Sequence, residues 1–136
     1  MLHIQWNTVS VVLLLGKEDD YKLLSNLSNG WKNLYDPETR LIRPKDTKGN
    51  FLEDFNPLAP WKGFQEGNAV QYTFYVPHQI DELVDLVGQE TFNNRLDSIF
   101  LLSQKNIFGG GKEVDAFAGL KTVYNHGNQP NLHISW

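Results

Sequence analysis

Side chains able to do acid–base chemistry and to bind a ligand stand close together between Glu66 and His78. Glu66 could act as a catalytic carboxylic acid, with Asn68, Gln71 and His78 near a bound molecule. Apolar and aromatic residues follow Glu66 at helical intervals, so the spacing places this carboxylate at the entrance of a helix. A carboxylate at that place also stabilises the exposed N–H groups of the helix by capping it. The spacing alone favours the capping role and leaves the catalytic role open.

A second polar stretch lies near the end of the sequence, from Tyr124 to Asn131. It is dense in hydrogen-bond donors and acceptors, and Pro130 suits the first turn of a helix that follows. A lone histidine such as His126 is more often a packed or surface residue than a ligand. The histidines of the chain lack the spacing of a zinc site, and the sequence has no cysteine.

Three stretches carry signatures in a fixed order along the chain. Asn33–Thr39 reads N-L-Y-D-P-E-T and is followed by R-P-K-D at Arg43–Asp46. Gln65–Phe74 contains E-G-N-A-V-Q-Y-T, and His126–Pro130 reads H-G-N-Q-P. Together they resemble the N-L-Y-D-P-E-T-G-x-x-R-P-R-D, E-G-N-A-W-Q-Y-T and G-N-E/Q-P segments of glycoside hydrolase family 92, the alpha-mannosidases. The resemblance runs from about Leu15 to Trp136.

Similarity to this family implies an inverting exo-alpha-mannosidase that acts on a mannose-containing glycan, with Glu66 as the general acid. It implies further residues that bind the sugar: Asn68, Gln71, His126, Asn128 and Gln129. The acid must stay protonated for its role, and burial among Trp61, Phe64 and Tyr72 would favour the neutral form. The resemblance also implies a calcium ion that binds sugar hydroxyls, and family members are usually exported. Amide oxygens are suitable calcium ligands but contribute no charge.

The carboxylate base of such an enzyme is implied to come from an aspartate-rich motif downstream, and this sequence contains no such motif. Asp81, Glu82 and Asp85 lie on one face of an expected helix, as is typical of a solvated surface. We therefore expect a fragment of the enzyme that supplies the general acid and part of the sugar subsite, and that does not hydrolyse mannosides alone. The alternative is a catalytically inactive carbohydrate-binding or structural remnant of a truncated gene.

Four positions depart from the family pattern. Val70 stands where the family usually has tryptophan, which would remove an aromatic wall of the site. Gln129 replaces the glutamate of members that act on alpha-1,2 linkages, Leu132 replaces a histidine, and Asn56 replaces an aspartate. The linkage that is cleaved therefore stays open, whereas the assignment of Glu66 is unaffected.

Composition limits the classes of protein that fit. The chain has 136 residues, enough for one modest domain spanning residues 1–136. Its net charge of -4 argues against a nucleic-acid partner. The longest apolar run, Val11–Leu15, is far shorter than a membrane span and lacks the flanks of a signal peptide. A basic cluster from Arg40 to Lys48 is interpreted as the solvated side of a turn.

Hydrophobic periodicity predicts a mainly α fold. Helices are expected at 20–35, 80–87 and 90–102, with a small β-hairpin near 41–53 and a flexible linker at 109–111. The first 15 residues fit either a strand or a helix that ends at Gly16. The resemblance implies that these helices form part of an alpha/alpha toroid. Helix faces left open in a partial toroid would expose apolar surface and favour self-association.

Overall fold

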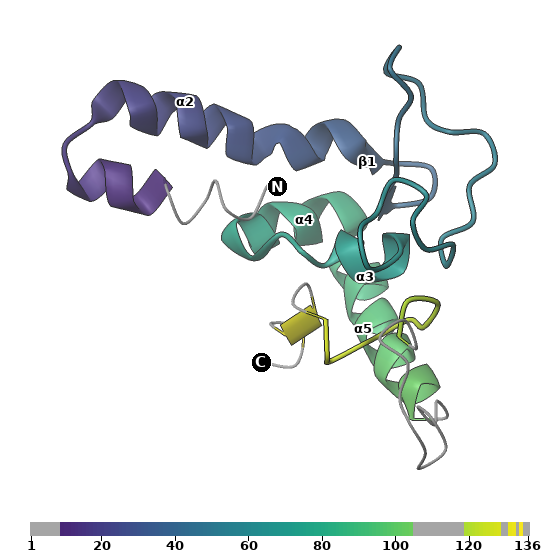
Figure 1. Ribbon diagram of the computed structural model, residues 1–136. Helices are drawn as coiled ribbons and strands as arrows, with labels where there is room; N and C mark the ends of the chain where they lie inside the picture. Colours follow the sequence, from purple (N-terminus) through teal and green to yellow (C-terminus); the bar gives the residue numbers. More distant parts are fainter. Residues whose placement is uncertain (1–8, 105–118, 129–130, 133, 135–136) are drawn as a thin grey trace. The chain divides into compact units, whose positions relative to one another are not determined.

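The computed structural model describes residues 9–104, 119–128, 131–132 and 134. The chain divides into two compact units, Met1–Tyr35 and Asp36–Trp136. Helices dominate both units, and one two-stranded sheet accompanies them, which confirms the predicted mainly α class (Figure 1). Among the described residues, no helix has the length and apolar character needed to cross a bilayer.

The described part of the first unit begins with a helix over residues 9–14, which settles the choice between strand and helix that the sequence left open. This helix ends at Gly16, as expected, because glycine adopts the left-handed conformation with φ of 68° at no steric cost. The Gly16 amide donates to the carbonyl of Leu13 and the Lys17 amide to that of Val12, each at 3.0 Å. These two bonds satisfy carbonyls that the end of a helix otherwise leaves unpaired.

The predicted helix at 20–35 is confirmed in position, although its last part winds more tightly. α2 spans Glu18–Ser28 and continues as a 3₁₀ helix, η1, over Asn29–Leu34. The change begins next to Gly30, a residue that weakens α-helices. Trp31 is buried as the periodicity indicated, with 2% of its surface exposed, whereas Leu27 on the same expected face is 44% exposed.

The second unit begins with short extended segments. β1 (Tyr35–Asp36) pairs with β2 (Leu41–Ile42), and a single antiparallel bridge joins Lys45 to Phe51. The hairpin predicted near 41–53 is therefore reduced to this bridge and the turn that it encloses.

Four helical segments lie between residues 69 and 103 of the second unit, and their order matches the prediction. They are α3 (Ala69–Thr73), η2 (Pro77–Gln79), α4 (Ile80–Val87) and α5 (Gln89–Ser103). The core contains Leu83 and Val87 of α4 together with Phe92 and Ile99 of α5. The acidic face of α4 is exposed to solvent, as expected. The linker predicted at 109–111 and Pro130 lie outside the described residues.

Thr73 ties α3 to the strands. Its hydroxyl donates to the carbonyl of Ala69 at 2.7 Å and accepts from the backbone amide of Ile42 at 2.9 Å. Phe74 continues this contact into the core, where its ring meets Phe92 edge-on with centroids 5.3 Å apart. The short helix that follows Glu66 is thus fixed on β2 and α5 by its buried side.

The basic cluster is only partly the solvated surface that the sequence indicated, because Arg40 and Lys48 are exposed but Arg43 is not. The Arg43 side chain is 15% exposed, and one of its terminal nitrogens lies 2.9 Å from the Asp36 carboxylate. Its other terminal nitrogen donates to the carbonyl of Leu52 at 2.6 Å, and its guanidinium lies over the rings of Phe51 and Phe55. The interpretation as a solvated surface is wrong for Arg43, because the fold brings Asp36, Leu52 and the two phenylalanine rings to its side chain.

Candidate active site

Glu66 lies in the loop just before α3, and its carboxylate does not cap the helix. The N-cap is Asn68, whose side-chain oxygen accepts from the backbone amide of Gln71 at 3.2 Å. Glu66 itself has a φ of 58°, a left-handed conformation that is uncommon for a residue with a side chain. Such conformations persist where surrounding contacts hold them, and they cluster at functional sites. The capping prediction for Glu66 is therefore wrong.

The surroundings of Glu66 are more open than the sequence suggested. Glu66 is exposed, and Trp61 shows 52% of its surface to solvent. Phe64 is buried and Tyr72 only partly so. The expectation that these three aromatic residues bury Glu66 is wrong for the described part of the chain.

Gly67 lets the loop and the helix come close together. A Cβ at this position would lie 2.8 Å from a Tyr72 ring carbon and 2.9 Å from the Gln71 side-chain oxygen. The Tyr72 hydroxyl reaches back over this contact and donates to the carbonyl of Gln65. Burial raises the pKa of Tyr72, and the negative charge of Glu66 raises it further. The carboxylate of Glu66 thus lies within electrostatic reach of the Tyr72 phenol.

Asn68 and Gln71, both expected to bind sugar, are fully buried and together form what we call the amide clamp. Asn68 Nδ2 donates to the carbonyls of Leu120 at 2.9 Å and Thr122 at 2.8 Å. Gln71 Nε2 donates to the carbonyls of Gly119 at 3.0 Å and Thr122 at 2.7 Å. Both side chains have 0% exposure, so their amide groups hold the chain together and do not face solvent. In this geometry the two amides hold the segment 119–122, and their expected contact with a sugar stays a prediction.

The segment held by the clamp leads directly to the second polar motif. Thr122 makes most of the contacts of this segment. The Thr122 carbonyl accepts from both clamp residues, and the Thr122 hydroxyl lies 2.8 Å from the carbonyls of Gly119 and Tyr124. Gly119 has no room for a side chain, because a Cβ there would lie 2.0 Å from the Asn125 amide nitrogen. Close packing on both sides therefore fixes the path of the chain into residues 124–128.

Asn128 joins the two motifs across 62 residues of sequence. Its side-chain nitrogen donates to the backbone carbonyl of Glu66, whose carboxylate stays exposed. His126, two residues earlier, is also exposed, and its Nδ1 lies 2.6 Å from the Tyr124 hydroxyl. Gln129 falls outside the described residues. Tyr124 belongs to the polar stretch seen in the sequence, but its partner is visible only once the turn is folded.

The oxygens near Glu66 do not by themselves suit a calcium ion. Calcium takes six to eight oxygen ligands and gains much of its affinity from carboxylates. The Asn68 side-chain oxygen is used by the helix cap, and that of Gln71 accepts from Asn131 at 3.5 Å. The buried side-chain oxygen of Asn131 accepts no hydrogen bond from the described residues, but it is one uncharged oxygen and calcium needs several ligands. Nor does any group of three or more His, Cys, Asp or Glu side chains gather in the part of the chain described here.

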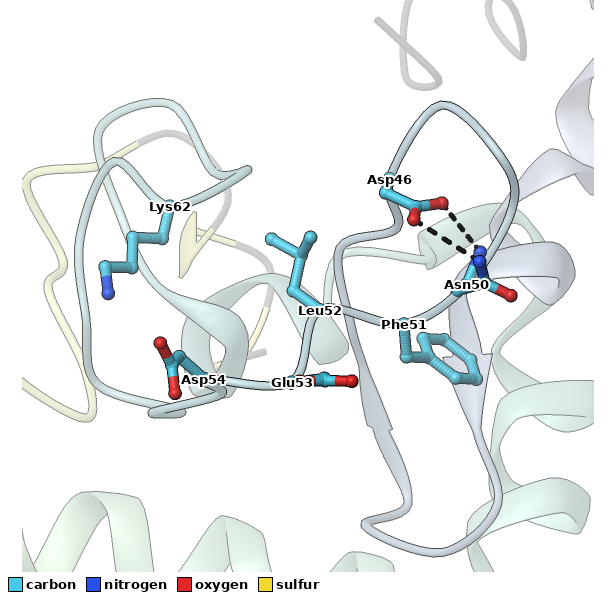
Figure 2. Close-up of a pocket in the computed structure, with 7 residues that line it drawn as sticks. All are labelled: Asp46, Asn50, Phe51, Leu52, Glu53, Asp54 and Lys62. Atoms are coloured by element: carbon cyan, nitrogen blue, oxygen red, sulfur yellow. Dashed lines mark hydrogen bonds between the residues drawn. The ribbon is translucent and has the colours of Figure 1, made fainter.

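A separate hollow of about 560 Å³ lies beside the turn that links Lys45 to Phe51 (Figure 2). It is lined by residues 50–54 together with Asp46 and Lys62, and Asp54 and Lys62 lie on the side away from Asp46. Asp46 accepts from the backbone amides of Asn50 at 2.9 Å and Lys48 at 2.8 Å. Those bonds hold the pKa of Asp46 below its ordinary value, the bond from Asn50 having the largest effect. Asp46 therefore serves to close the turn.

Val70, which replaces the family's tryptophan, lines an apolar hollow of about 220 Å³ next to α5. Phe74, Ile99 and Leu102 are among its other walls. In this chain the Val70 side chain thus lies at a hollow that borders the core of the second unit.

Replacing Asn68 with alanine is expected to lower the free energy of unfolding by about 1–3 kcal/mol. The substitution removes the helix cap and the donor to the Leu120 carbonyl, and it leaves the Thr122 carbonyl with the Gln71 amide as its remaining clamp donor. Urea unfolding followed by circular dichroism measures the change. Asn93→Ala is the matched control, because Asn93 is exposed on α5. Equal midpoints for the two variants would show that the clamp does not stabilise the fold.

The chain was compared with protein-family models, with curated proteins and with solved structures. The family model described as "Glycosyl hydrolase family 92 catalytic domain" matches residues 5–136. A family GH92 alpha-mannosidase, BT3965 from Bacteroides thetaiotaomicron, is 33% identical with a TM-score of 0.79, and the match covers 98% of this chain and 16% of that one. The structure of that enzyme in complex with mannoimidazole gives 30% identity, a TM-score of 0.80 and coverages of 98% and 18%. The inverting mannosidase BT2199 from the same bacterium is 30% identical with a TM-score of 0.74, and the match covers 98% of this chain and 19% of that one. The chain thus spans less than a fifth of each of these proteins, and no curated protein matches it.

Proposed function

The chain belongs to glycosyl hydrolase family 92, and from this membership we propose that it acts on alpha-mannosides, with Glu66 as the general acid of an inverting reaction. The observation that carries the proposal is the hydrogen bond from Asn128 to the carbonyl of Glu66. It brings together two motifs that lie far apart in the sequence. The exposed groups of the two motifs, Glu66 and His126, are then available to a ligand.

In the proposed reaction Glu66 donates a proton to the glycosidic oxygen as the bond to the leaving sugar breaks. His126 and Asn128 contact sugar hydroxyls. Asn68 and Gln71 hold the two motifs together through their hydrogen bonds to residues 119–122. A glycan seated on Glu66 would exclude the water that reaches this carboxylate in the free chain. Calcium enters the proposal through the family alone, because its carboxylate ligands would have to come from outside the described residues.

The reaction also needs a carboxylate base about 6.5–9.5 Å from the acid, across the sugar ring. Among the acidic residues described, Asp36 and Asp46 use their carboxylates in hydrogen bonds within the chain, and Asp81, Glu82 and Asp85 are solvated on α4. We therefore propose that the chain by itself does not turn over mannosides and contributes the acid half of the machinery.

Incubation of the purified chain with an aryl alpha-mannoside and calcium is expected to give no turnover above buffer. A chimera tests the acid directly: this chain replaces the matching segment of the BT3965 enzyme, which supplies the remaining residues. We expect the chimera to hydrolyse the mannoside and Glu66→Gln to lower its rate by about 10²–10⁴-fold.

Glu53→Gln is the control for the chimera, since it removes another exposed carboxylate of the same unit. A folded chimera whose activity is the same with Glu66→Gln would contradict the role of Glu66. Turnover by the isolated chain that is lost in Glu66→Gln would instead show that the chain holds its own base.

A further inference from the structure

We propose that Tyr124 is a positioning residue that fixes the tautomer and the orientation of His126, so that the Nε2–H bond of the imidazole faces outward. The sugar-binding part of this inference rests on the proposed function of His126. The part that concerns the ring alone does not depend on it.

The contact between the two side chains is short. The Tyr124 hydroxyl lies 2.6 Å from His126 Nδ1, within the range of a strong hydrogen bond. A phenol is the better donor of the two groups and a neutral imidazole nitrogen the better acceptor. With Nδ1 accepting, the one proton of the neutral ring has to reside on Nε2. The ring therefore presents a donor on the side that faces away from Tyr124.

Tyr124 can hold the ring because it is itself held at both ends. Its ring packs against Phe100 of α5, with centroids 5.1 Å apart. Its backbone carbonyl lies 2.8 Å from the Thr122 hydroxyl, and the Thr122 carbonyl receives both donors of the amide clamp. His126 is exposed, so its position depends on these partly buried contacts of Tyr124 and Thr122.

An outward Nε2–H bond selects the chemistry of the ligand atom that it meets. It donates to an oxygen lone pair, as a sugar hydroxyl offers, and it does not accept a proton from that hydroxyl. Asn128 lies two residues on and bonds the Glu66 carbonyl, so this donor is tethered to the loop that carries the acid. Tyr124 would thus determine which hydroxyl orientation the site accepts without touching the sugar.

Nitrogen NMR of the chain labelled with ¹⁵N-histidine tests the ring directly, at about pH 8.5, where imidazoles are ordinarily neutral. His126→Gln assigns the signals. In the native chain we expect a protonated Nε2 and a hydrogen-bonded, unprotonated Nδ1. In Tyr124→Phe the Nδ1 signal should move toward the position of a free, unprotonated nitrogen.

Tyr124→Phe keeps the ring that packs on Phe100 and removes the hydroxyl alone, and Tyr21→Phe in the first unit is the matched control. A protonated Nδ1 in the native chain would overturn the inference. So would an Nδ1 signal that is the same in the native chain and in Tyr124→Phe. Amide spectra that coincide away from residues 122–128 establish that the variant keeps its fold.

Titration with methyl alpha-mannoside separates this inference from the proposed function. We expect Tyr124→Phe to weaken binding by about 3- to 10-fold, as the loss of one oriented hydrogen bond implies, and His126→Gln to weaken it at least as much. Binding that is unchanged in Tyr124→Phe would overturn the positioning role. No binding by the native chain, with the expected nitrogen signals present, would support the ring assignment and overturn the sugar-binding function of His126.

Discussion

Replacing Trp31 with alanine is expected to lower the free energy of unfolding by about 3–5 kcal/mol. The indole is 2% exposed and is the largest of the fully buried side chains described. Its removal takes away a large apolar surface and leaves a cavity that the surrounding residues fill only in part. Urea denaturation followed by far-ultraviolet circular dichroism gives the unfolding midpoint, and the slope of the transition shows whether unfolding remains cooperative.

Leu23→Ala serves as the control for Trp31, because Leu23 lies on α2 and is 59% exposed. We expect that control to change stability by no more than about 0.5 kcal/mol, as is usual for surface positions. A midpoint for Trp31→Ala as high as that of Leu23→Ala would show that Trp31 does not belong to the core.

Replacing Asp36 with asparagine is expected to cost about 3–5 kcal/mol at neutral pH. The Asp36 carboxylate is buried and accepts from Arg43 at 2.9 Å, the Thr39 hydroxyl at 2.8 Å and the Glu38 amide at 3.0 Å. The substitution would leave the guanidinium of Arg43 mostly buried without a counter-charge, which is far more costly than losing an exposed ion pair. Unfolding midpoints of the two proteins measure the difference.

The same pair predicts how stability depends on pH. Burial acts to raise the pKa of Asp36, but the hydrogen bonds from Arg43, Thr39 and Glu38 outweigh it and lower the pKa below its ordinary value. A lowered pKa in the folded chain means that the carboxylate stabilises the fold above about pH 4 and that this stabilisation is lost as the pH falls further.

The difference in the free energy of unfolding between the native chain and Asp36→Asn should therefore become smaller in acid. Glu38→Gln is the control, since it removes a neighbouring exposed charge and keeps the backbone donor. A difference in unfolding free energy that stays constant down to about pH 2 would contradict the claim that ionised Asp36 stabilises the fold through Arg43.

The helices could be predicted because their signals are local. Apolar residues spaced by three and four residues predicted α5, and the combined span of α2 and η1, to within a few positions, and Gly88 marks where α4 ends. A local signal for the true N-cap was also present. Asn68 precedes Gln71 by three residues, the spacing of a capping box, and this pattern identifies Asn68 as the cap that was assigned to Glu66.

The roles of the site residues could not be predicted in the same way, since they depend on distant partners. Nothing near Asn68 or Gln71 in the sequence indicates that carbonyls from residues 119–122 will take up both amides. Arg43 was assigned to a solvated surface for the same reason, because Asp36 and two phenylalanine rings reach it only in the fold. The directions of the Asn68, Gln71 and Arg43 side chains thus became visible only in the fold, and the location of a sugar site at Glu66 stays a prediction.

The amide clamp has a consequence for how the chain folds. Its four bonds join residues 48 to 54 positions apart, whereas the bonds of α4 and α5 are local. Closing so long a loop costs entropy before any of the four bonds forms, so the helices come first and the clamp last. Contacts made after the folding barrier affect the rate of unfolding and hardly that of folding. The cost of losing the clamp bonds themselves should therefore appear as a native state that opens sooner, with refolding at nearly the native speed.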